Sequence, residues 1–387
     1  MRVFLVAGEP SGDKLGAALM AGLTSLADVE YLGVGGPLMQ AEGLSSLFPM
    51  DELSVMGLAE VLPKYPALRR RMIQTAEAIL KAKPDVLITI DSPDFCLRVA
   101  KRVKAQSDVK TVHYVAPSVW AWRAGRAKKM ARHIDHVLAL LPFEPPYMQA
   151  AGMSCDFVGH PVVAEPVPTA DQQAAFRATY GVQDSRILLV LPGSRRSEVA
   201  RLAPRFGEAL HPVLAQHPDL RLVCPTTQAA EPVLREAVES WPAKPVILTQ
   251  GHMKSDAYAA EKRAAFYAAD YALAASGTVS LELAAARTPM VIAYDANWLT
   301  RAIVKRMLKI DTATLVNLVS DTRAVPEYNG DTCQPEWIGP GVLQMIDDHA
   351  DQLKAMQVTM ERLGQGGEPP GVRAAKSVLG QLGHGAV

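Results

Sequence analysis

The amino-acid sequence predicts an α/β protein of two doubly wound, Rossmann-like domains. Short runs rich in β-branched residues alternate with segments of helical length, the pattern of parallel sheets with right-handed crossovers. A proline-rich stretch at 161–168 separates an earlier series of runs from a later one. The length of 387 residues exceeds what one hydrophobic core usually serves. Because ligands bind beyond the carboxyl ends of parallel strands, two such domains facing each other would enclose a central cleft.

Each predicted strand is an apolar run followed by a segment of helical length. The strands of the first series are Val3–Ala7, Val86–Ile90, Thr111–Val115 and Val137–Leu141. Those of the second series are Ile187–Leu191, Leu220–Cys224, Val246–Leu248, Tyr271–Ala274 and Met290–Ala293. The two series predict a first domain over 1–164 and a second over 165–364. The tail 365–387 carries a helical stretch over 372–382 that could pack back on the first domain.

Charge and cysteine content narrow the class of protein. The 40 basic and 40 acidic residues cancel, so no long-range field gathers nucleic acid and no nucleic-acid partner is expected. The four cysteines stand far apart without a C-x-x-C pair, which indicates a reducing cytoplasm rather than disulfides or zinc. The N-terminus lacks the pattern of a signal peptide, and no apolar run reaches the roughly 18 residues that span a bilayer. We therefore expect a soluble protein, or one bound only to a membrane surface.

A glycine turn follows the predicted strand Ile187–Leu191. Gly193 lets the backbone approach a ligand closely, Ser197 can cap the next helix, and the helix-start N–H groups attract an anion. Arg195, beside Ser194, adds a fixed cation with several donors for a diphosphate. The segment predicts a phosphate-binding turn, although an ordinary strand-to-helix turn with surface arginines fits it equally well.

A second glycine turn follows the predicted strand Tyr271–Ala274. Ser276, Gly277 and Thr278 open a helix and suit a phosphate, while Glu282 lies one turn further along the face of Thr278. A carboxylate there can accept both hydroxyls of a ribose, as in dinucleotide folds. The alternative is a glutamate that only complements the helix dipole. Two anion-binding turns in one domain favour a bound nucleotide.

Other common phosphate-binding patterns are missing from the sequence. The G-x-x-x-x-G-K-[ST] motif of P-loop ATPases is absent, and the glycines at 33–36 lack the G-x-G-x-x-G spacing. The sequence also has no Asp-x-Asp pair, so a metal-bridged diphosphate is not suggested. Arg195 and helix dipoles would then have to stabilise a leaving diphosphate. We expect neither a metal nor a cofactor.

The turn after the first strand, residues 8–13, can face the same cleft from the first domain. Its candidate acceptor-site residues are Glu9, Ser11, Gly12 and Asp13. A turn in which Asp13 is the N-cap of the following helix explains these residues nearly as well.

Two carboxylates follow the strand Val86–Ile90, where α/β enzymes place catalytic groups. Either Asp91 or Asp94 could deprotonate an acceptor hydroxyl. In the alternative, Asp91 caps the helix 95–103 and Asp94 lies in its first turn. Only one aspartate is needed as a cap, which favours Asp94 as the base.

Aromatic and basic residues follow the strand Thr111–Val115. Trp120 and Trp122 offer apolar and stacking surface at the mouth of a cleft, and Arg123 begins a run of cations suited to phosphate. Both tryptophans fit a core position equally well. The run 133–136 contains two histidines, which we interpret as a solvated helix end rather than a metal site.

The segment 53–71 combines apolar residues with a basic cluster. A helix that lies on anionic lipid presents such a surface. A core-packing helix with a charged end is the more common alternative. The candidate membrane and acyl-chain contacts are Val55, Met56, Leu58, Val61, Leu62, Arg69 and Arg70.

Several motifs together resemble one family over nearly the whole chain and in the same order. They are AGEPSGD, DSPDF, HYVAPSVWAWR, LPFEPPYM, GHP at 159–161, LPGSRRSEV, SGTVSLELA and TLVNL. The combination is similar to that of the bacterial lipid-A-disaccharide synthases. Ala116 stands where serine is common in the family, a departure that puts little in doubt.

The resemblance implies an inverting glycosyltransferase of the GT-B type. It would join UDP-2,3-diacylglucosamine to 2,3-diacylglucosamine 1-phosphate (lipid X), releasing UDP. The family implies Asp94 as the base and Arg195 at the diphosphate, with Asn317 near the nucleotide. It also implies a cytoplasmic protein at the inner membrane surface, with the segment 53–71 as the contact. The glycine- and proline-rich segment 364–370 would permit a homodimer that exchanges C-terminal tails.

Two other functions fit the same turns. One is another enzyme that uses UDP-N-acetylglucosamine, either an epimerase or a peptidoglycan-type transferase. The other is an inactive nucleotide-sugar binding protein, against which the joint presence of Asp94, Arg195 and Glu282 argues.

Overall fold

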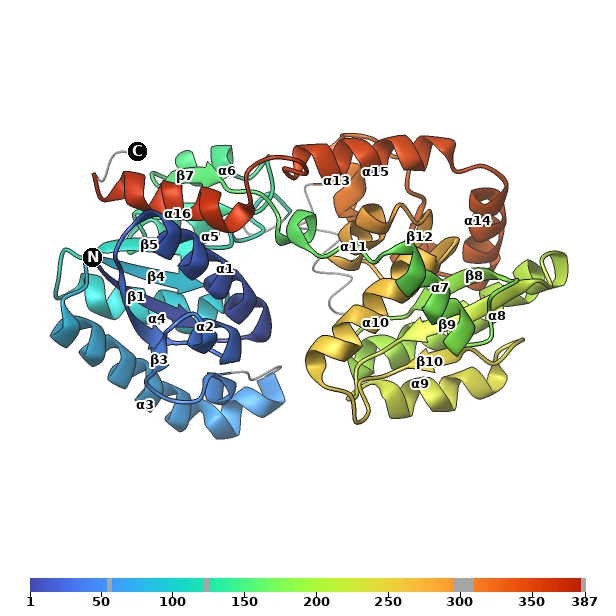
Figure 1. Cartoon of the computed structure of the whole chain (residues 1–387), viewed down its shortest axis with the longest axis horizontal. Coiled ribbons are helices and arrows are strands. Elements are labelled where there is room, and N and C mark those ends of the chain that lie inside the picture. Colours follow the sequence, from blue (N-terminus) through green and yellow to red (C-terminus); the bar gives the residue numbers. More distant parts are fainter. Residues whose placement is uncertain (54–57, 122–124, 296–309, 384–387) are drawn as a thin grey trace. The chain divides into compact units, whose positions relative to one another are not determined.

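The computed structural model describes residues 1–53, 58–121, 125–295 and 310–383, with only the backbone for 58–64 (Figure 1). The chain divides into two compact units, one formed by Met1–Ala164 with Leu363–Val387 and the other by Glu165–Arg362. Among the described residues every strand pairing in either unit is parallel. The predicted fold class of two parallel α/β domains is therefore confirmed.

Unit 1 contains a sheet of seven described strands in the order β3-β2-β1-β4-β5-β6-β7. The strands are β1 (Arg2–Ala7), β2 (Glu30–Val34), β3 (Ser45–Ser46), β4 (Val86–Ile90), β5 (Lys110–Tyr114), β6 (His136–Ala139) and β7 (Ser154–Phe157). The helices are α1 (Pro10–Leu26), α2 (Pro37–Ala41), α3 (Leu58–Ala82), α4 (Pro93–Lys104), α5 (Gly125–Met130), α6 (Pro145–Gln149) and α16 (Pro370–Gln381). Short 3₁₀ turns are η1 (Met50–Leu53) and η2 (Pro161–Ala164).

The two faces of the unit 1 sheet are covered by different helices because side chains alternate along each strand. In β1, Val3 and Leu5 pack with apolar residues of α1, α2 and α16, whereas Phe4 and Val6 pack with those of α3, α4, α5 and α6. Figure 1 shows α16, from the end of the chain, alongside α1. The last helix thus completes the hydrophobic core of the first unit.

Unit 2 contains a sheet of six described strands in the order β10-β9-β8-β11-β12-β13. The strands are β8 (Arg186–Leu191), β9 (Leu220–Pro225), β10 (Val246–Leu248), β11 (Tyr271–Ala274), β12 (Met290–Tyr294) and β13 (Glu327–Asn329). The helices are α7 (Ala170–Thr179), α8 (Arg196–Gln216), α9 (Glu231–Ala237), α10 (Ser255–Ala268), α11 (Val279–Ala286), α13 (Leu315–Ser320), α14 (Pro335–Asp347) and α15 (Ala350–Arg362). Short 3₁₀ turns are η3 (Val238–Ser240) and η4 (Gly330–Thr332).

One face of the unit 2 sheet packs against α8, α9 and α14. Leu188 and Val190 of β8 lie in this core with Phe206 of α8, Leu234 of α9 and Ile338 of α14. Fully apolar strands of this kind are expected where helices cover a parallel sheet.

Two strands of unit 1 end earlier than the sequence predicts. Val115 was expected in β5, but its φ of 87° lies in the left-handed region and ends the strand at Tyr114. Leu140 and Leu141 were expected in β6, but their N–H groups donate to the carboxylate of Glu144 instead of a neighbouring strand. The backbone conformation of Val115 and the side chain of Glu144 therefore end these two strands before their apolar runs end.

Both sheets reverse their strand order at an interior point, the topological switch point at which α/β folds bind ligands. In unit 1 the reversal lies between β1 and β4, and in unit 2 it lies between β8 and β11. The turns after these four strands are the segments that begin at residues 8, 91, 192 and 275. The motifs singled out in the sequence thus flank the two switch points.

Candidate functional site

In unit 1 the turns after β1 and β4 meet at the switch point. The hydroxyl of Ser11 donates a hydrogen bond to Oδ2 of Asp91 at 3.1 Å. At the same place, a Cβ on Gly8 would lie 2.7 Å from Oγ of Ser92, so a side chain at position 8 would force Ser92 aside. Two motifs that are 80 residues apart thus form one surface.

The turn that carries the candidate base is strained. Asp91 and Ser92 both adopt left-handed φ values, 51° and 41°. Each such residue costs about 1–3 kcal/mol, and such strain clusters at active sites and ligand clamps. Helix α4 begins at Pro93, and no side chain caps it, so the alternative in which Asp91 is its cap is wrong. Asp94 is exposed in the first turn of α4.

Gly12 and Asp13 are buried inside unit 1. The carboxylate of Asp13 accepts three backbone N–H bonds at the start of α2, so Asp13 caps α2 and the predicted capping of its own helix is wrong. The donors are Gly36 at 2.9 Å, Leu38 at 3.0 Å and Met39 at 3.0 Å. A Cβ on Gly12 would lie 3.3 Å from the carbonyl oxygen of Ile90, which explains the glycine by close packing. Glu9 is the N-cap residue of α1.

Trp120 is half-buried in the loop after β5. Its indole N–H donates to Oε1 of Glu144 at 3.3 Å, and its ring packs edge-on against Phe143. Trp120 therefore makes internal contacts while its side chain stays partly exposed. Arg123 and Trp122 lie outside the described residues.

In unit 2 the turn after β8 holds a carboxylate of its own. Oε2 of Glu198 accepts the N–H groups of Ser194 at 3.2 Å and Arg195 at 3.3 Å, while Oε1 accepts Nη1 of Arg195 at 3.0 Å. A Cβ on Gly193 would lie 2.7 Å from Cβ of Glu198, and φ of Gly193 is 123°, so glycine is required there. Glu198, and not Ser197 as predicted, caps α8. The donors expected to hold a diphosphate bind an anionic group in this structure.

The turn after β11 exposes Gly277 and Thr278 at the start of α11. A Cβ on Gly277 would meet nothing within 4 Å, so the packing of the unit does not require glycine here. Ser276 donates to the carbonyl oxygen of Ala313 at 3.4 Å. In this turn Ser276 therefore bonds to the segment at Ala313, whereas Gly277 borders open space.

Glu282 of α11 forms an ion pair with Lys262 of α10. The distance from Nζ to Oε2 is 2.6 Å, and both side chains are partly exposed. Lys262 also lies over the ring of Phe266, 5.1 Å from its centroid. The pair therefore ties the first turn of α11 to α10 and orients the carboxylate of Glu282.

Asn317 is buried in α13, and hydrogen bonds within unit 2 occupy its side chain. The amide oxygen accepts the N–H of Val325 at 3.0 Å. The amide nitrogen donates to the Val325 carbonyl oxygen and to Oε1 of Glu327, both at 2.9 Å, and to Thr312. Asn317 thus fixes the chain around 312–327, next to Ala313, the partner of Ser276.

The segment 53–71 lies partly outside the described residues. Val55 and Met56 fall there, and of Leu58, Val61 and Leu62 only the backbone, in α3, is described. Arg69 and Arg70 are exposed on α3. Arg71 instead binds both carboxylate oxygens of Glu52, at 2.6 and 2.7 Å. No described helix is long and apolar enough to cross a bilayer.

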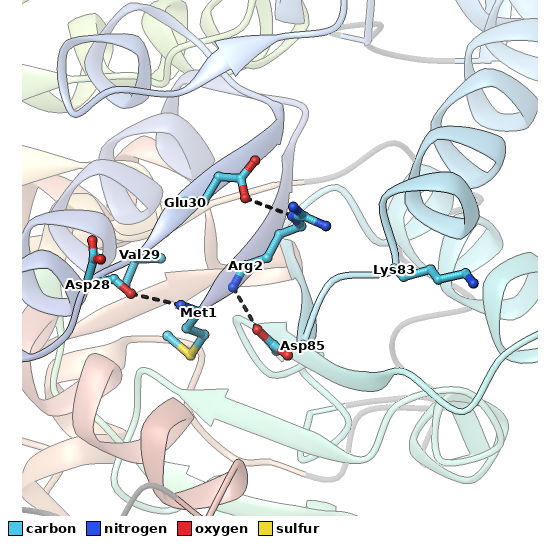
Figure 2. A pocket seen from close by; sticks show the side chains of 7 residues that line it. All are labelled: Met1, Arg2, Asp28, Val29, Glu30, Lys83 and Asp85. Atoms are coloured by element: carbon cyan, nitrogen blue, oxygen red, sulfur yellow. Dashed lines mark hydrogen bonds and ion pairs between the residues drawn. The ribbon is translucent and has the colours of Figure 1, made fainter.

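A polar pocket lies at the opposite edge of the unit 1 sheet (Figure 2). It is lined by the amino ends of β1, β2 and β4, where Arg2 pairs with Glu30 at 2.9 Å and its backbone N–H donates to Asp85 at 2.7 Å. Ligands of parallel sheets bind at the carboxyl edge, so this pocket is distinct from the candidate site.

Three residues that the sequence reasoning missed belong to the candidate site: Glu144, Glu198 and Lys262. Glu198 carried a readable signal, because an acidic residue is favoured in the first turn of a helix. Glu144 and Lys262 act on residues 24 and 20 positions away, and no local pattern predicts such contacts.

Solved structures share the fold of the whole chain. A Staphylococcus aureus MnaA structure with UDP superposes with a TM-score of 0.66 at 12% identity, covering 99% of this chain and 97% of that chain. The UDP-GlcNAc 2-epimerase of Neisseria meningitidis, bound to UDP-GlcNAc, gives 0.65 at 11% identity, covering 99% and 100%. At these identities the likeness shows the fold alone.

Sequence relatives are much closer. The lipid-A-disaccharide synthase of Ruegeria pomeroyi is 62% identical over 99% of this chain and 96% of the relative. That of Rhodospirillum centenum is 46% identical over 97% of this chain and 94% of the relative. The family model described as lipid-A-disaccharide synthetase matches residues 3–379. With both switch points carrying the motifs of that family, the chain belongs to the lipid-A-disaccharide synthetases, a family of glycosyltransferases.

Proposed function

We propose that the protein joins UDP-2,3-diacylglucosamine to 2,3-diacylglucosamine 1-phosphate, forming lipid A disaccharide 1-phosphate and UDP. Family membership supports the reaction class. The observation that carries the assignment is a polar turn at each switch point: a strained carboxylate turn in unit 1 and an anion-binding turn in unit 2. The acceptor is assigned to unit 1 and the nucleotide sugar to unit 2.

UDP is proposed to bind at the carboxyl edge of the unit 2 sheet. Arg195 and the N–H groups of its turn would bind the diphosphate, and the carboxylate of Glu282 would accept the ribose hydroxyls. Gly277 leaves room for the nucleotide at the start of α11. Asn317 contributes through the chain segment that it fixes beside Ser276. Two fold neighbours that hold UDP or UDP-GlcNAc support a UDP-sugar as the ligand of this fold.

Asp94 is proposed as the general base. Its carboxylate takes the proton of the acceptor 6-hydroxyl while that oxygen attacks the anomeric carbon from the face opposite UDP. The bond between the anomeric carbon and the diphosphate breaks, and UDP leaves with the electron pair, stabilised by Arg195 and the helix N-terminus. Asp91, held by Ser11, remains the second candidate for the base.

Incubation with both lipid substrates in detergent, followed by mass detection of the disaccharide, tests the reaction. Formation of the disaccharide and UDP in equal amounts supports it. Conversion of UDP-N-acetylglucosamine without a lipid acceptor would instead support an epimerase, the activity of the fold neighbours. Binding of UDP without turnover of any lipid acceptor would support an inactive binding protein.

The variant Asp94→Asn tests the base. Loss of the proton acceptor should lower kcat by about 10²- to 10⁴-fold, while UDP affinity, measured by calorimetry, stays unchanged because Asp94 belongs to the other unit. Asp108→Asn, at an exposed position after α4, is the matched control and should keep full activity. An active Asp94→Asn enzyme, with an inactive Asp91→Asn enzyme, would move the assignment to Asp91.

The acyl chains are proposed to meet the protein at the segment 53–71, at the cytoplasmic surface of the inner membrane. The exposed Arg69 and Arg70 support a contact with anionic lipid. Sedimentation with vesicles that contain anionic lipid tests the contact. Substitution of both arginines by glutamine should release the protein, and sedimentation equal to that of the unsubstituted protein would contradict it.

A homodimer with exchanged tails is a further proposal that light scattering can test.

A further inference from the structure

Glu144 is a buried carboxylate that joins two loops at the carboxyl edge of the unit 1 sheet. Its side chain is 4% exposed. Oε2 accepts the N–H groups of Leu140 at 3.2 Å and Leu141 at 3.0 Å, in the turn after β6. Oε1 accepts the indole N–H of Trp120, in the loop after β5. Although Glu144 is the N-cap residue of α6, its side chain makes no cap bond to that helix.

Trp120 is held on a second side by the same turn. Its ring meets Phe143 edge-on, with centroids 5.2 Å apart and planes at 84°. Edge-to-face geometry is favourable for aromatic pairs, and a bond to a carboxylate is stronger than a neutral one. The indole is therefore fixed in orientation by two contacts from residues 143 and 144.

The loop that carries Trp120 is tight and strained. Val115, at its start, has a φ of 87°, a conformation that is unfavourable for a β-branched residue. Further along, the N–H of Val119 bonds to the Pro117 carbonyl oxygen at 2.6 Å, and that of Ala121 bonds to the Ser118 carbonyl oxygen at 3.2 Å. Such a loop keeps its conformation only where its surroundings hold it.

A carboxylate is an expensive group to use for packing. Burial raises the pKa of Glu144 to about 7, even though three N–H donors favour its charged form. The charge of Glu144 acts on the thiol of Cys155, in β7. Burial raises the pKa of that thiol to about 12, so the thiol stays neutral. The carboxylate satisfies three N–H donors, which an apolar side chain of the same size would leave without a partner.

We propose that Glu144 is a positioning residue for the acceptor: through Trp120 it holds the loop 115–121 in the conformation that receives the acceptor sugar. This inference rests on the proposed function, in which unit 1 binds the acceptor. Glu144 itself touches no reacting atom. Its effect is to keep the indole and the loop 115–121 in place before the substrate arrives, which lowers the ordering cost of binding.

Glu144→Gln and Trp120→Phe test the proposal in the full-length enzyme. Glutamine keeps the volume of the side chain but sets an NH₂ group against N–H donors, and phenylalanine keeps a ring but removes the indole donor. Each variant should raise the acceptor KM about tenfold, as expected for loss of a charge-assisted bond, with kcat within about twofold and UDP affinity unchanged. The double variant should be no worse than the poorer single one, because both remove the same contact. Glu77→Gln, at an exposed site on α3, is the matched control.

The pH dependence supplies a readout that a packing role would not give. Below pH about 7 the carboxyl is protonated and loses one acceptor position, so the acceptor KM of the unsubstituted enzyme should rise as the pH falls. This rise should be smaller in Glu144→Gln, which lacks the carboxyl but not the titration of the acceptor's own phosphate. An unchanged acceptor KM in both variants, or equal losses in kcat, acceptor KM and thermal stability, would overturn the proposal.

Tryptophan fluorescence separates this proposal from the assigned reaction. The difference spectrum between the unsubstituted protein and Trp120→Phe should titrate with a midpoint near pH 7 and should stop titrating in the Glu144→Gln background. If the enzyme forms no disaccharide, the assigned reaction fails, while this titration still decides whether Glu144 holds Trp120. A Trp120 spectrum that is the same in the unsubstituted protein and in the Glu144→Gln background would overturn the proposal by itself.

Discussion

Glu198 controls access to the donors of the Arg195 turn. Its carboxylate binds two backbone N–H groups and the guanidinium, which are the groups that a diphosphate would use. A diphosphate that uses these donors must first displace the carboxylate, so part of its binding energy goes into that exchange. Removing the negative charge of the carboxylate should weaken the competition while leaving the turn intact.

Glu198→Gln should therefore bind UDP more tightly, by roughly 1 kcal/mol, as measured by calorimetry. Glu208→Gln, at an exposed position of the same helix, is the control. Weaker UDP binding by Glu198→Gln would mean that the carboxylate orients Arg195 for the diphosphate and does not compete with it for the donors of the turn.

Gly277 offers a second test of the nucleotide site. Because a Cβ there meets open space, Gly277→Ala should leave the unfolding temperature unchanged or slightly higher. A nucleotide that approaches the backbone at this turn would meet the new methyl group, and we expect UDP affinity to fall by about 1–3 kcal/mol. Unchanged affinity would place the nucleotide away from this turn.

The candidate residues in the turns were predictable from the sequence, but the residues that they bond to were not. Gly193, Arg195 and Glu282 stand out because glycine turns after strands and first-turn acids have a known physical use. That Lys262 pairs with Glu282, or that Ser11 bonds Asp91, depends on which strands become neighbours in the sheet. Contacts of this range are set by the assembled fold.

At the scale of elements, α16 packs on α1 through backbone contacts. A Cβ on Gly371 would collide with the carbonyl oxygen of Ala18, and one on Gly22 would lie 2.5 Å from the carbonyl oxygen of Gly371. Small residues allow this approach, and Ala375 and Val378 then reach the core.

Gly371→Ala should destabilise unit 1 by about 1–3 kcal/mol, the usual cost of overpacking. Gly380→Ala provides a control in the same helix, because a Cβ at 380 meets nothing within 4 Å. The control should be neutral or slightly stabilising, since alanine favours helix over glycine. Denaturant unfolding measures both, and equal effects would show that the α1 contact is looser than the geometry implies.

Apolar strands were predictable even where they are short, whereas the polar strand β13 was not. Val86–Ile90 and Tyr271–Ala274 were predicted with the bounds that the structure has. The three residues Glu327–Asn329 form β13, although only Tyr328 among them favours a strand, because Tyr294 and its neighbours in β12 provide an edge to pair with. His136, read as part of a solvated helix end, instead begins β6 and bonds to Ser377 of α16. Tertiary pairing decided these cases.

At the scale of the whole molecule, each unit has its own sheet and its own hydrophobic core. Because each unit has its own core, the two units can respond separately to a ligand. A nucleotide bound to unit 2 alone should stabilise that unit and leave the other unaffected.

Calorimetric unfolding with UDP should show this separation. At a UDP concentration of 100 times Kd, unit 2 should gain about 2.7 kcal/mol, so its transition moves to higher temperature. Gly371→Ala should lower only the other transition, which identifies it as that of unit 1. A single transition that shifts as a whole in both experiments would show that the units unfold together.

The course of the chain has a consequence for synthesis on the ribosome. Unit 1 opens the chain but is completed by Pro370–Gln381, after the whole of Glu165–Arg362 has been made. While the ribosome translates that stretch, the apolar face of α1, with Leu19 and Leu23, is not yet covered by α16. The unit made second can therefore finish folding first, and the nascent first unit is the one that would need a chaperone.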